Sequence, residues 1–254
     1  MKNHTLFHPF LSFNVRAYLP PATCLLPVLL ILFAVQISGW QWSPEKVDSS
    51  LSLLSYWVSQ SMPVIGIIFI ALTVYLLRLR LRLNFRQNVL LLMCIAAVLL
   101  SGAGVKRVFK DSWQEPRPYV VWLQKQPELA ANLPVKGFYE LSDKSAFVSG
   151  LNLSGTSVPE WQQSYWAKNT GYSFPSGHSL FALQLMLMML TLLWREKAHM
   201  LIVLAVCWTT VVLGSRLVLG MHWPVDLLAS GVLAFVLNIP FVLFWGKQRL
   251  SLVK

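Results

Sequence analysis

The stretch that decides the fold class is Met200–Leu219, MLIVLAVCWTTVVLGSRLVL, in which Arg216 is the single charged residue. A helix that crosses a bilayer needs about 20 consecutive, mainly apolar residues. The run is continuously apolar and does not alternate, which favours a helix over a strand of a membrane barrel. We therefore expect Met200–Leu219 to be a membrane-spanning helix.

Five other apolar runs of this kind occur along the chain. Its 254 residues are 56% hydrophobic and 12% charged, whereas a soluble domain carries about 25% charged residues. Trp40, Trp194 and Trp245 lie near run ends, as expected for a side chain that prefers the head-group level. We expect an all-α membrane protein with a single domain, whose six transmembrane helices cover residues 22–40, 56–77, 88–109, 177–194, 199–219 and 224–245.

The orientation follows from the basic residues. They gather after the second and fourth runs and in the C-terminal tail, at Arg78, Arg80, Arg82, Arg86, Arg195, Lys197, Lys247, Arg249 and Lys254. The positive-inside rule puts these segments and both termini in the cytoplasm. The first, third and fifth connections then lie outside, which in the inner membrane of a Gram-negative bacterium is the periplasm. The third connection, 110–176, is expected to form a small periplasmic subdomain.

The chain has a formal net charge of +11. In a soluble protein this excess would suggest nucleic acid as a partner. Here the basic residues lie mostly at the ends of apolar runs, so we interpret them as topology signals and contacts to lipid head groups. The expected partners are the lipid bilayer and its lipids, and nucleic acid is not among them.

A first polar motif, Lys110–Pro118, follows the third run with the sequence KDSWQEPRP. Prolines on both sides of Arg117 make a rigid turn that presents this residue together with Lys110. Arginine offers a planar fork of donors to phosphate oxygens, and lysine supplies a mobile point charge. The alternative is a cluster of basic side chains that extend to the membrane surface, a role that we assign to Lys106 and Arg107.

A second motif, FPSGH at Phe174–His178, directly precedes the fourth run. Ser176 is a natural N-cap for a helix, and Gly177 allows close approach of a ligand to the backbone. The free N–H groups at such a helix start attract anions. His178 would lie in the first turn beside the bound anion, although a lone histidine at a membrane interface is more often inert.

A third motif, SRLVLGMHWPVD, spans the fifth connection at Ser215–Asp226. Pro224 suits the first turn of the next helix. His222 and Asp226 are four residues apart and can share one helix face. A carboxylate on one imidazole nitrogen leaves the other nitrogen available as a nucleophile. Arg216 is a charged residue at the end of a span, which favours a functional role.

The expected topology brings the three motifs to the same outer side of the membrane. Together they supply the cations Lys110, Arg117 and Arg216, two histidines, one acid and a helix N-terminus. This set has the components that phosphoryl transfer through a covalent histidine requires.

These motifs resemble the signature of the type 2 phosphatidic acid phosphatase family, K-x6-R-P, then P-S-G-H, then S-R-x5-H-x3-D, at every position. The resemblance covers the chain from the third run to the sixth. It implies a membrane-bound fold of six spans and the hydrolysis of lipid phosphates without a metal ion or other cofactor. Phosphatidylglycerophosphate is the expected substrate, with undecaprenyl diphosphate and phosphatidate as further ones.

The resemblance also implies a role for each motif residue. His222 would attack phosphorus to form a phosphohistidine, with Asp226 orienting it. His178 would protonate the leaving oxygen and then activate water. The phosphate oxygens would be bound by Lys110, Arg117, Arg216, Ser176 and the Gly177 amide.

Three alternatives remain open at this point. One is a phosphatase dedicated to undecaprenyl diphosphate, the carrier lipid of the cell wall. Another is a transporter or binding protein for lipid phosphates, which would need the cations but neither histidine. The third is halogenation, since the family's pocket is similar to that of vanadium haloperoxidases, although six spans argue against such a soluble enzyme.

Overall fold

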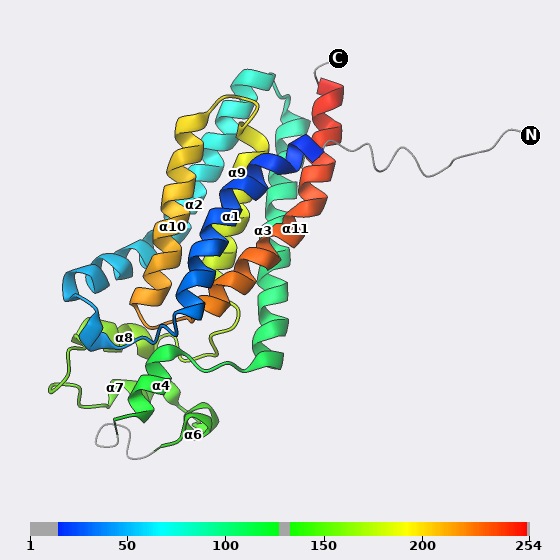
Figure 1. Cartoon of the computed structure of the whole chain (residues 1–254). Coiled ribbons are helices and arrows are strands. Elements are labelled where there is room, and N and C mark those ends of the chain that lie inside the picture. The colour runs from blue at the N-terminus through cyan, green and yellow to red at the C-terminus, as the bar shows by residue number, and fades with distance from the viewer. Residues whose placement is uncertain (1–14, 127–132, 253–254) are drawn as a thin grey trace, which may run out of the picture.

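The computed structural model describes residues 15–126 and 133–252, and within these ranges every regular element is a helix (Figure 1). Lys254 of the basic tail and residues 127–132 of the third connection lie outside the described residues. The long helices are α1 Val15–Ile37, α2 Ser49–Leu81, α3 Phe85–Trp113, α9 Gly177–Leu193, α10 His199–Val218 and α11 Pro224–Leu252. The short ones are the 3-10 helix η1 Pro44–Lys46 and the α-helices α4 Pro118–Gln124, α6 Val135–Glu140, α7 Lys144–Ser149 and α8 Glu160–Ala167.

Five of the described helices, α1, α2, α3, α10 and α11, are long and apolar enough to cross a membrane. Their outer surfaces expose large apolar side chains such as Ile31, Ile67 and Met93, each more than 60% accessible. Water would disfavour such a surface, whereas lipid chains suit it. The protein is therefore a multi-pass membrane protein.

The sixth apolar helix, α9, is shorter, with 17 residues. It packs against α1, α2, α3, α10 and α11, and every residue from Ala182 to Leu190 is buried. An apolar helix that is covered on all sides by other helices forms the core of a bundle. The N-terminus of this central helix is the PSGH motif.

Side-chain caps fix the starts of several helices. Asp48 accepts hydrogen bonds from the backbone N–H groups of Ser50 and Leu51 at the start of α2, at 2.8 and 3.2 Å. Asn84 and Gln87 form a reciprocal capping box at the start of α3. These bonds satisfy N–H groups that the helices themselves leave unpaired.

α2 and α3 extend beyond the apolar runs expected to span the membrane at 56–77 and 88–109. The apolar run marks the hydrocarbon region, whereas the helix continues through the polar residues on either side. As a consequence Lys110 lies in the last turn of α3, inside a helix and not at the start of the following connection.

The short helices α4, α6, α7 and α8 lie together at one end of the bundle, and the start of α1 and the end of α11 lie at the opposite end (Figure 1). A buried cluster holds these short helices to the bundle. In it Tyr119 stacks on Trp166 with ring centroids 4.8 Å apart, and Trp42 meets Trp166 edge-on at 5.6 Å. This end of the bundle also carries the three polar motifs.

Candidate active site

His222 lies in the connection between α10 and α11, and Asp226 lies in the first turn of α11. His222 Nδ1 is 3.2 Å from Asp226 Oδ2, and the backbone N–H of Trp223 donates to the same oxygen at 2.9 Å. Both side chains are buried, with 2% and 0% of their surface exposed. The carboxylate accepts a hydrogen bond from Nδ1–H of the imidazole. The proton is then on Nδ1, and Nε2 is the nitrogen with a free lone pair.

The protonation state of His222 follows from its surroundings. Burial lowers the pKa of His222 well below its ordinary value, and the nearby charges of Arg117 and Arg216 lower it further. The imidazole is therefore neutral at physiological pH. A neutral imidazole whose orientation is fixed by a carboxylate can act as a nucleophile.

Arg216 lies in the last turn of α10 and is 1% exposed. Its Nη1 donates to the hydroxyl of Tyr165 on α8, at 2.7 Å, and to the hydroxyl of Ser59 on α2. These two hydroxyls also contact each other at 3.0 Å. The buried Nε of Arg216 has no hydrogen-bond partner, so this donor is available to a ligand.

Arg117 and Lys110 are held by backbone carbonyl groups. Arg117 donates from Nε to the carbonyl of Gly171 at 2.6 Å and from Nη1 to that of Met221 at 3.0 Å. Lys110 Nζ donates to the carbonyl of Tyr172. Carbonyl groups orient the two cations without neutralising them.

The PSGH motif starts α9 as the sequence pattern predicts. Ser176 caps the helix, since its side chain accepts from the Ser179 backbone N–H at 3.4 Å and contacts the Ser179 hydroxyl at 2.8 Å. His178 is the second residue of α9 and is partly buried. A Cβ atom on Gly177 would lie 2.7 Å from Cδ of Lys106, so the Lys106 side chain packs directly over this glycine.

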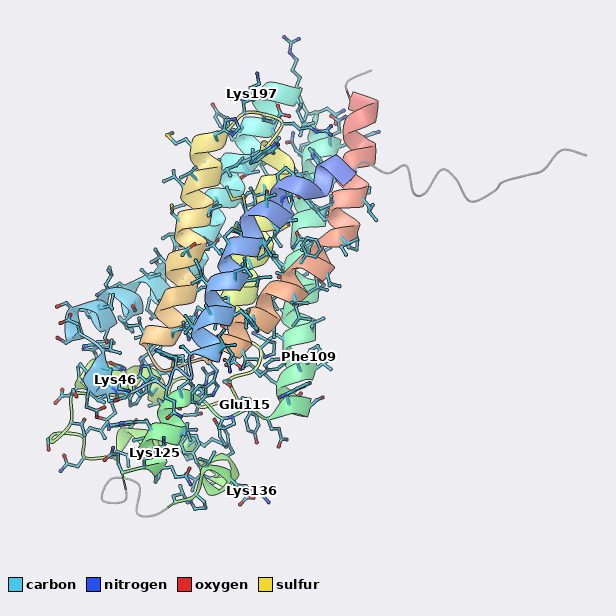
Figure 2. The ribbon with its side chains drawn as sticks, in the orientation of Figure 1. Lys46, Phe109, Glu115, Lys125, Lys136 and Lys197 are labelled. Atoms are coloured by element: carbon cyan, nitrogen blue, oxygen red, sulfur yellow. The ribbon has the colours of Figure 1, made fainter. Side chains whose placement is uncertain are left out.

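Hydrogen bonds between the motifs hold them in one site. Ser230 of α11 donates to the carbonyl of Ser176 at 3.1 Å, and the Trp223 indole donates to the carbonyl of Pro116 at 2.8 Å. The backbone N–H of Ser173 donates to the carbonyl of Glu115 at 2.8 Å, and in Figure 2 Glu115 lies beyond Phe109 at the short-helix end of α3. The first and third motifs are thus bonded directly, and the second is held through Ser173, which precedes it, and through Ser230 of α11.

The turn before His222 is packed just as tightly. Gly220 has φ +67°, and a Cβ atom there would lie 2.7 Å from the ring of Trp42. The indoles of Trp42 and Trp166 donate to the carbonyls of Val218 and Leu219, at 2.8 and 3.0 Å. A residue from the connection after α1 therefore helps to hold the loop that carries His222.

Three side chains at the site were not predicted from the sequence as site residues. Ser59 and Tyr165 are outside all three motifs, and only the tertiary packing brings them to Arg216. Lys106, which we had assigned to the membrane surface, is partly buried across Gly177, while its neighbour Arg107 is exposed. The signal for Lys106 was its position four residues before Lys110, which puts both on one face of α3.

The arrangement suits an anion with more than one negative charge. Among the side chains that the structure describes, Lys136 pairs with Glu140 and His222 with Asp226, and neither pair includes a cation of the three motifs. The site cations Lys110, Arg117 and Arg216 are therefore not paired with a carboxylate. Buried charge without a partner is costly, and a bound phosphate would remove that cost.

Comparison with known proteins agrees with this chemistry. Phosphatidylglycerophosphatase B of Escherichia coli (strain K12) is 35% identical over 230 residues, which cover 88% of this chain and 86% of that protein. The protein of the same name from Haemophilus influenzae is 28% identical over 240 residues, covering 89% of this chain and 95% of that protein. Residues 88–250, which contain all three motifs, match the PAP2 superfamily, and the predicted resemblance is confirmed: the chain belongs to this superfamily.

Proposed function

We propose that the protein is a lipid phosphate phosphatase that hydrolyses phosphatidylglycerophosphate to phosphatidylglycerol, and also accepts undecaprenyl diphosphate and phosphatidate. The observation that carries the proposal is the buried His222–Asp226 pair among cations that lack a carboxylate partner. Membership of the PAP2 superfamily and the names of the relatives support the same substrate class. No step of the proposed reaction requires a metal ion.

The reaction proceeds in two steps. Lys110, Arg117 and Arg216, with Ser176 and the Gly177 amide, bind the phosphate oxygens and stabilise the charge of the transition state. Nε2 of His222 attacks phosphorus, and as this bond forms the bond from phosphorus to the leaving oxygen breaks. His178 donates a proton to that oxygen.

In the second step, His178 takes a proton from water, which attacks the phosphohistidine. The bond between phosphorus and Nε2 then breaks, inorganic phosphate leaves, and both histidines return to their starting states. Asp226 keeps Nδ1 protonated throughout, so that Nε2 faces phosphorus in every turnover.

We further propose that α9 is a sixth span and that the site faces the periplasm from the inner membrane. At about 1.5 Å per residue a helix of this length reaches most of the way across the hydrocarbon layer, and its enclosure by other helices relaxes the length requirement. In Figure 2, Lys46, Lys125 and Lys136 lie at the end of the bundle that carries the short helices. Lys197 lies at the opposite end. Arg78, Arg80, Arg82 and Arg86, at the end of α2 and the start of α3, support a cytoplasmic assignment of the Lys197 end.

Cysteine labelling tests this orientation. In intact cells a membrane-impermeant maleimide should label Ser154→Cys, in the exposed loop between α7 and α8, but not Arg86→Cys at the opposite end. Both variants should be labelled once the cells are broken. The parent protein provides the background from its own cysteines, and the reverse labelling pattern would invert the topology.

The test of function is phosphate release by the purified protein in detergent micelles. Specificity constants for phosphatidylglycerophosphate, undecaprenyl diphosphate and phosphatidate should all be measurable. Activity with undecaprenyl diphosphate alone would support the dedicated carrier-lipid phosphatase. Binding of all three lipids without phosphate release would support a transporter or binding protein and overturn the proposal.

Tyr165→Phe should weaken catalysis because it removes the hydroxyl that holds Nη1 of Arg216. A hydrogen bond to a charged group contributes about 1.5–3 kcal/mol, so kcat/KM should fall about tenfold or more. Thermal melting should show that the variant remains folded at the assay temperature, because the ring and its packing are kept. Tyr56→Phe is the matched control, since this ring packs edge-on against Tyr165 and is not bonded to Arg216. Equal losses in both variants would contradict a role for the Tyr165 hydroxyl.

A further inference from the structure

Lys106 occupies an unexpected place beside the proposed active site. It lies on α3 one turn before Lys110, on the same face of the helix. A Cβ atom on Gly177 would lie 2.7 Å from its Cδ and 3.3 Å from its Nζ. The ammonium group therefore lies over the first residue of α9, which directly precedes His178 in the chain.

This ammonium group is a fourth cation without a carboxylate. Within the described residues Lys106 takes part in neither ion pair, and its positive charge acts on both His178 and Lys110. Three cations already surround the site for one phosphate. A fourth, partly buried and facing the same helix N-terminus, adds a favourable place for a second negative group.

The direction along α3 identifies which part of a substrate would lie there. α3 runs from the Arg-rich end of the bundle towards the short helices, so Lys106 lies about 6 Å deeper in the bundle than Lys110. A lipid's apolar chains extend from the scissile phosphate into the bilayer, which is the same direction. His178, which would protonate the leaving oxygen, directly follows Gly177 in the chain.

From this placement we infer that Lys106 binds a second, non-scissile phosphate on the leaving-group side of the substrate. This inference rests on the proposed function and assigns an additional contact to substrates that carry two phosphates. Two kinds of lipid share this chemistry: a diphosphate lipid, whose second phosphate is directly linked, and phosphatidylglycerophosphate, whose second phosphate is a diester across a glycerol. Phosphatidate has a single phosphate and cannot make the contact.

The test compares Lys106→Met with the parent on three lipids in the purified full-length protein. Methionine keeps an unbranched chain over Gly177 and removes the charge. We expect kcat/KM for undecaprenyl diphosphate and phosphatidylglycerophosphate to fall about tenfold or more, and the loss on phosphatidate to be several times smaller. If only one of the two-phosphate lipids is affected, it identifies which kind of second phosphate Lys106 binds. The ratio of the specificity constant for each two-phosphate lipid to that for phosphatidate should therefore fall in the variant. A general structural role of Lys106 would lower all three constants equally and leave this ratio unchanged.

Arg107→Met is the matched control, because Arg107 is the next residue on α3 and is exposed. It should leave all three specificity constants at the parent values. A uniform loss across the three lipids in Lys106→Met would overturn this inference and leave the proposed function standing. Absence of phosphate release from all three lipids by the parent protein would instead overturn the proposed function.

A second measurement uses soluble inhibitors in place of lipid substrates. Methylenediphosphonate, which carries two linked phosphonates, should inhibit the parent protein about tenfold more strongly than methylphosphonate. If Lys106 provides the second contact, Lys106→Met should remove most of that difference. Equal inhibition of the parent by the two compounds would overturn the contact with a diphosphate.

Discussion

His222→Asn should abolish phosphate release, lowering kcat by about four orders of magnitude or more, the range typical of a lost nucleophile. Asparagine can keep an N–H directed at Asp226 but has no atom that can reach phosphorus in place of Nε2. The cations that bind phosphate remain, so the variant should still bind substrate. Initial rates on phosphatidylglycerophosphate, together with equilibrium binding of the same lipid, separate lost chemistry from lost folding.

Trapping the phosphohistidine tests whether the lost activity of His222→Asn reflects a lost covalent intermediate. During turnover of a substrate labelled in its scissile phosphate, the parent protein should acquire an acid-labile, base-stable label that His222→Asn lacks. His199→Asn is the control, because this exposed histidine lies at the opposite end of α10 from Arg216 and outside all three motifs. Full phosphate release by His222→Asn would refute covalent catalysis, and absence of label under rapid quench would favour direct attack by water.

His178→Ala should lower turnover of lipid substrates by about 10²–10⁴-fold, the usual contribution of a general acid–base. The size of the loss depends on the leaving group. An alkoxide needs a proton as it departs, whereas p-nitrophenolate does not. The first step with p-nitrophenyl phosphate should therefore survive in the variant, and the hydrolysis of the phosphohistidine should become rate-limiting.

The measurement is a pre-steady-state time course. With p-nitrophenyl phosphate, His178→Ala should release a burst of nitrophenolate that matches the amount of enzyme and should accumulate labelled His222. The double variant His178→Ala/His222→Asn provides the control and should show neither burst nor label. Equal losses on lipid and nitrophenyl substrates, without accumulated label, would show that His178 does not act as acid and base.

The sequence predicted the helical membrane fold because the backbone of a continuous apolar run must satisfy its own hydrogen bonds inside a bilayer, and a helix does so. It predicted the helix ends less well, since hydropathy detects the hydrocarbon layer and not the caps. Asp48 starts α2 well before its apolar run, and α3 continues to Trp113 through polar residues. Boundaries of this kind depend on local hydrogen bonds to single side chains.

The site was largely predictable because its residues lie in three short motifs with fixed spacing. The His222–Asp226 contact follows from their separation by one helical turn. Ser59 and Tyr165 could not be found in this way, because each is distant from Arg216 in the chain and only the packing of α2 and α8 against α10 brings them to it. The place of Lys106 over Gly177 could not be predicted either, because a basic residue near a helix end has the same sequence pattern whether it faces lipid or a ligand.

The hydrogen bonds of Trp42 and Ser59 have a consequence for dissecting this protein into parts. The segment that matches the superfamily begins at residue 88, yet Ser59 holds the side chain of Arg216 and Trp42 supports the turn before His222 from outside that segment. The segment matched by the superfamily therefore lacks part of the structural support of the candidate site. A fragment that starts at residue 88 would keep every signature residue but would lose two of the contacts that hold the third motif in place.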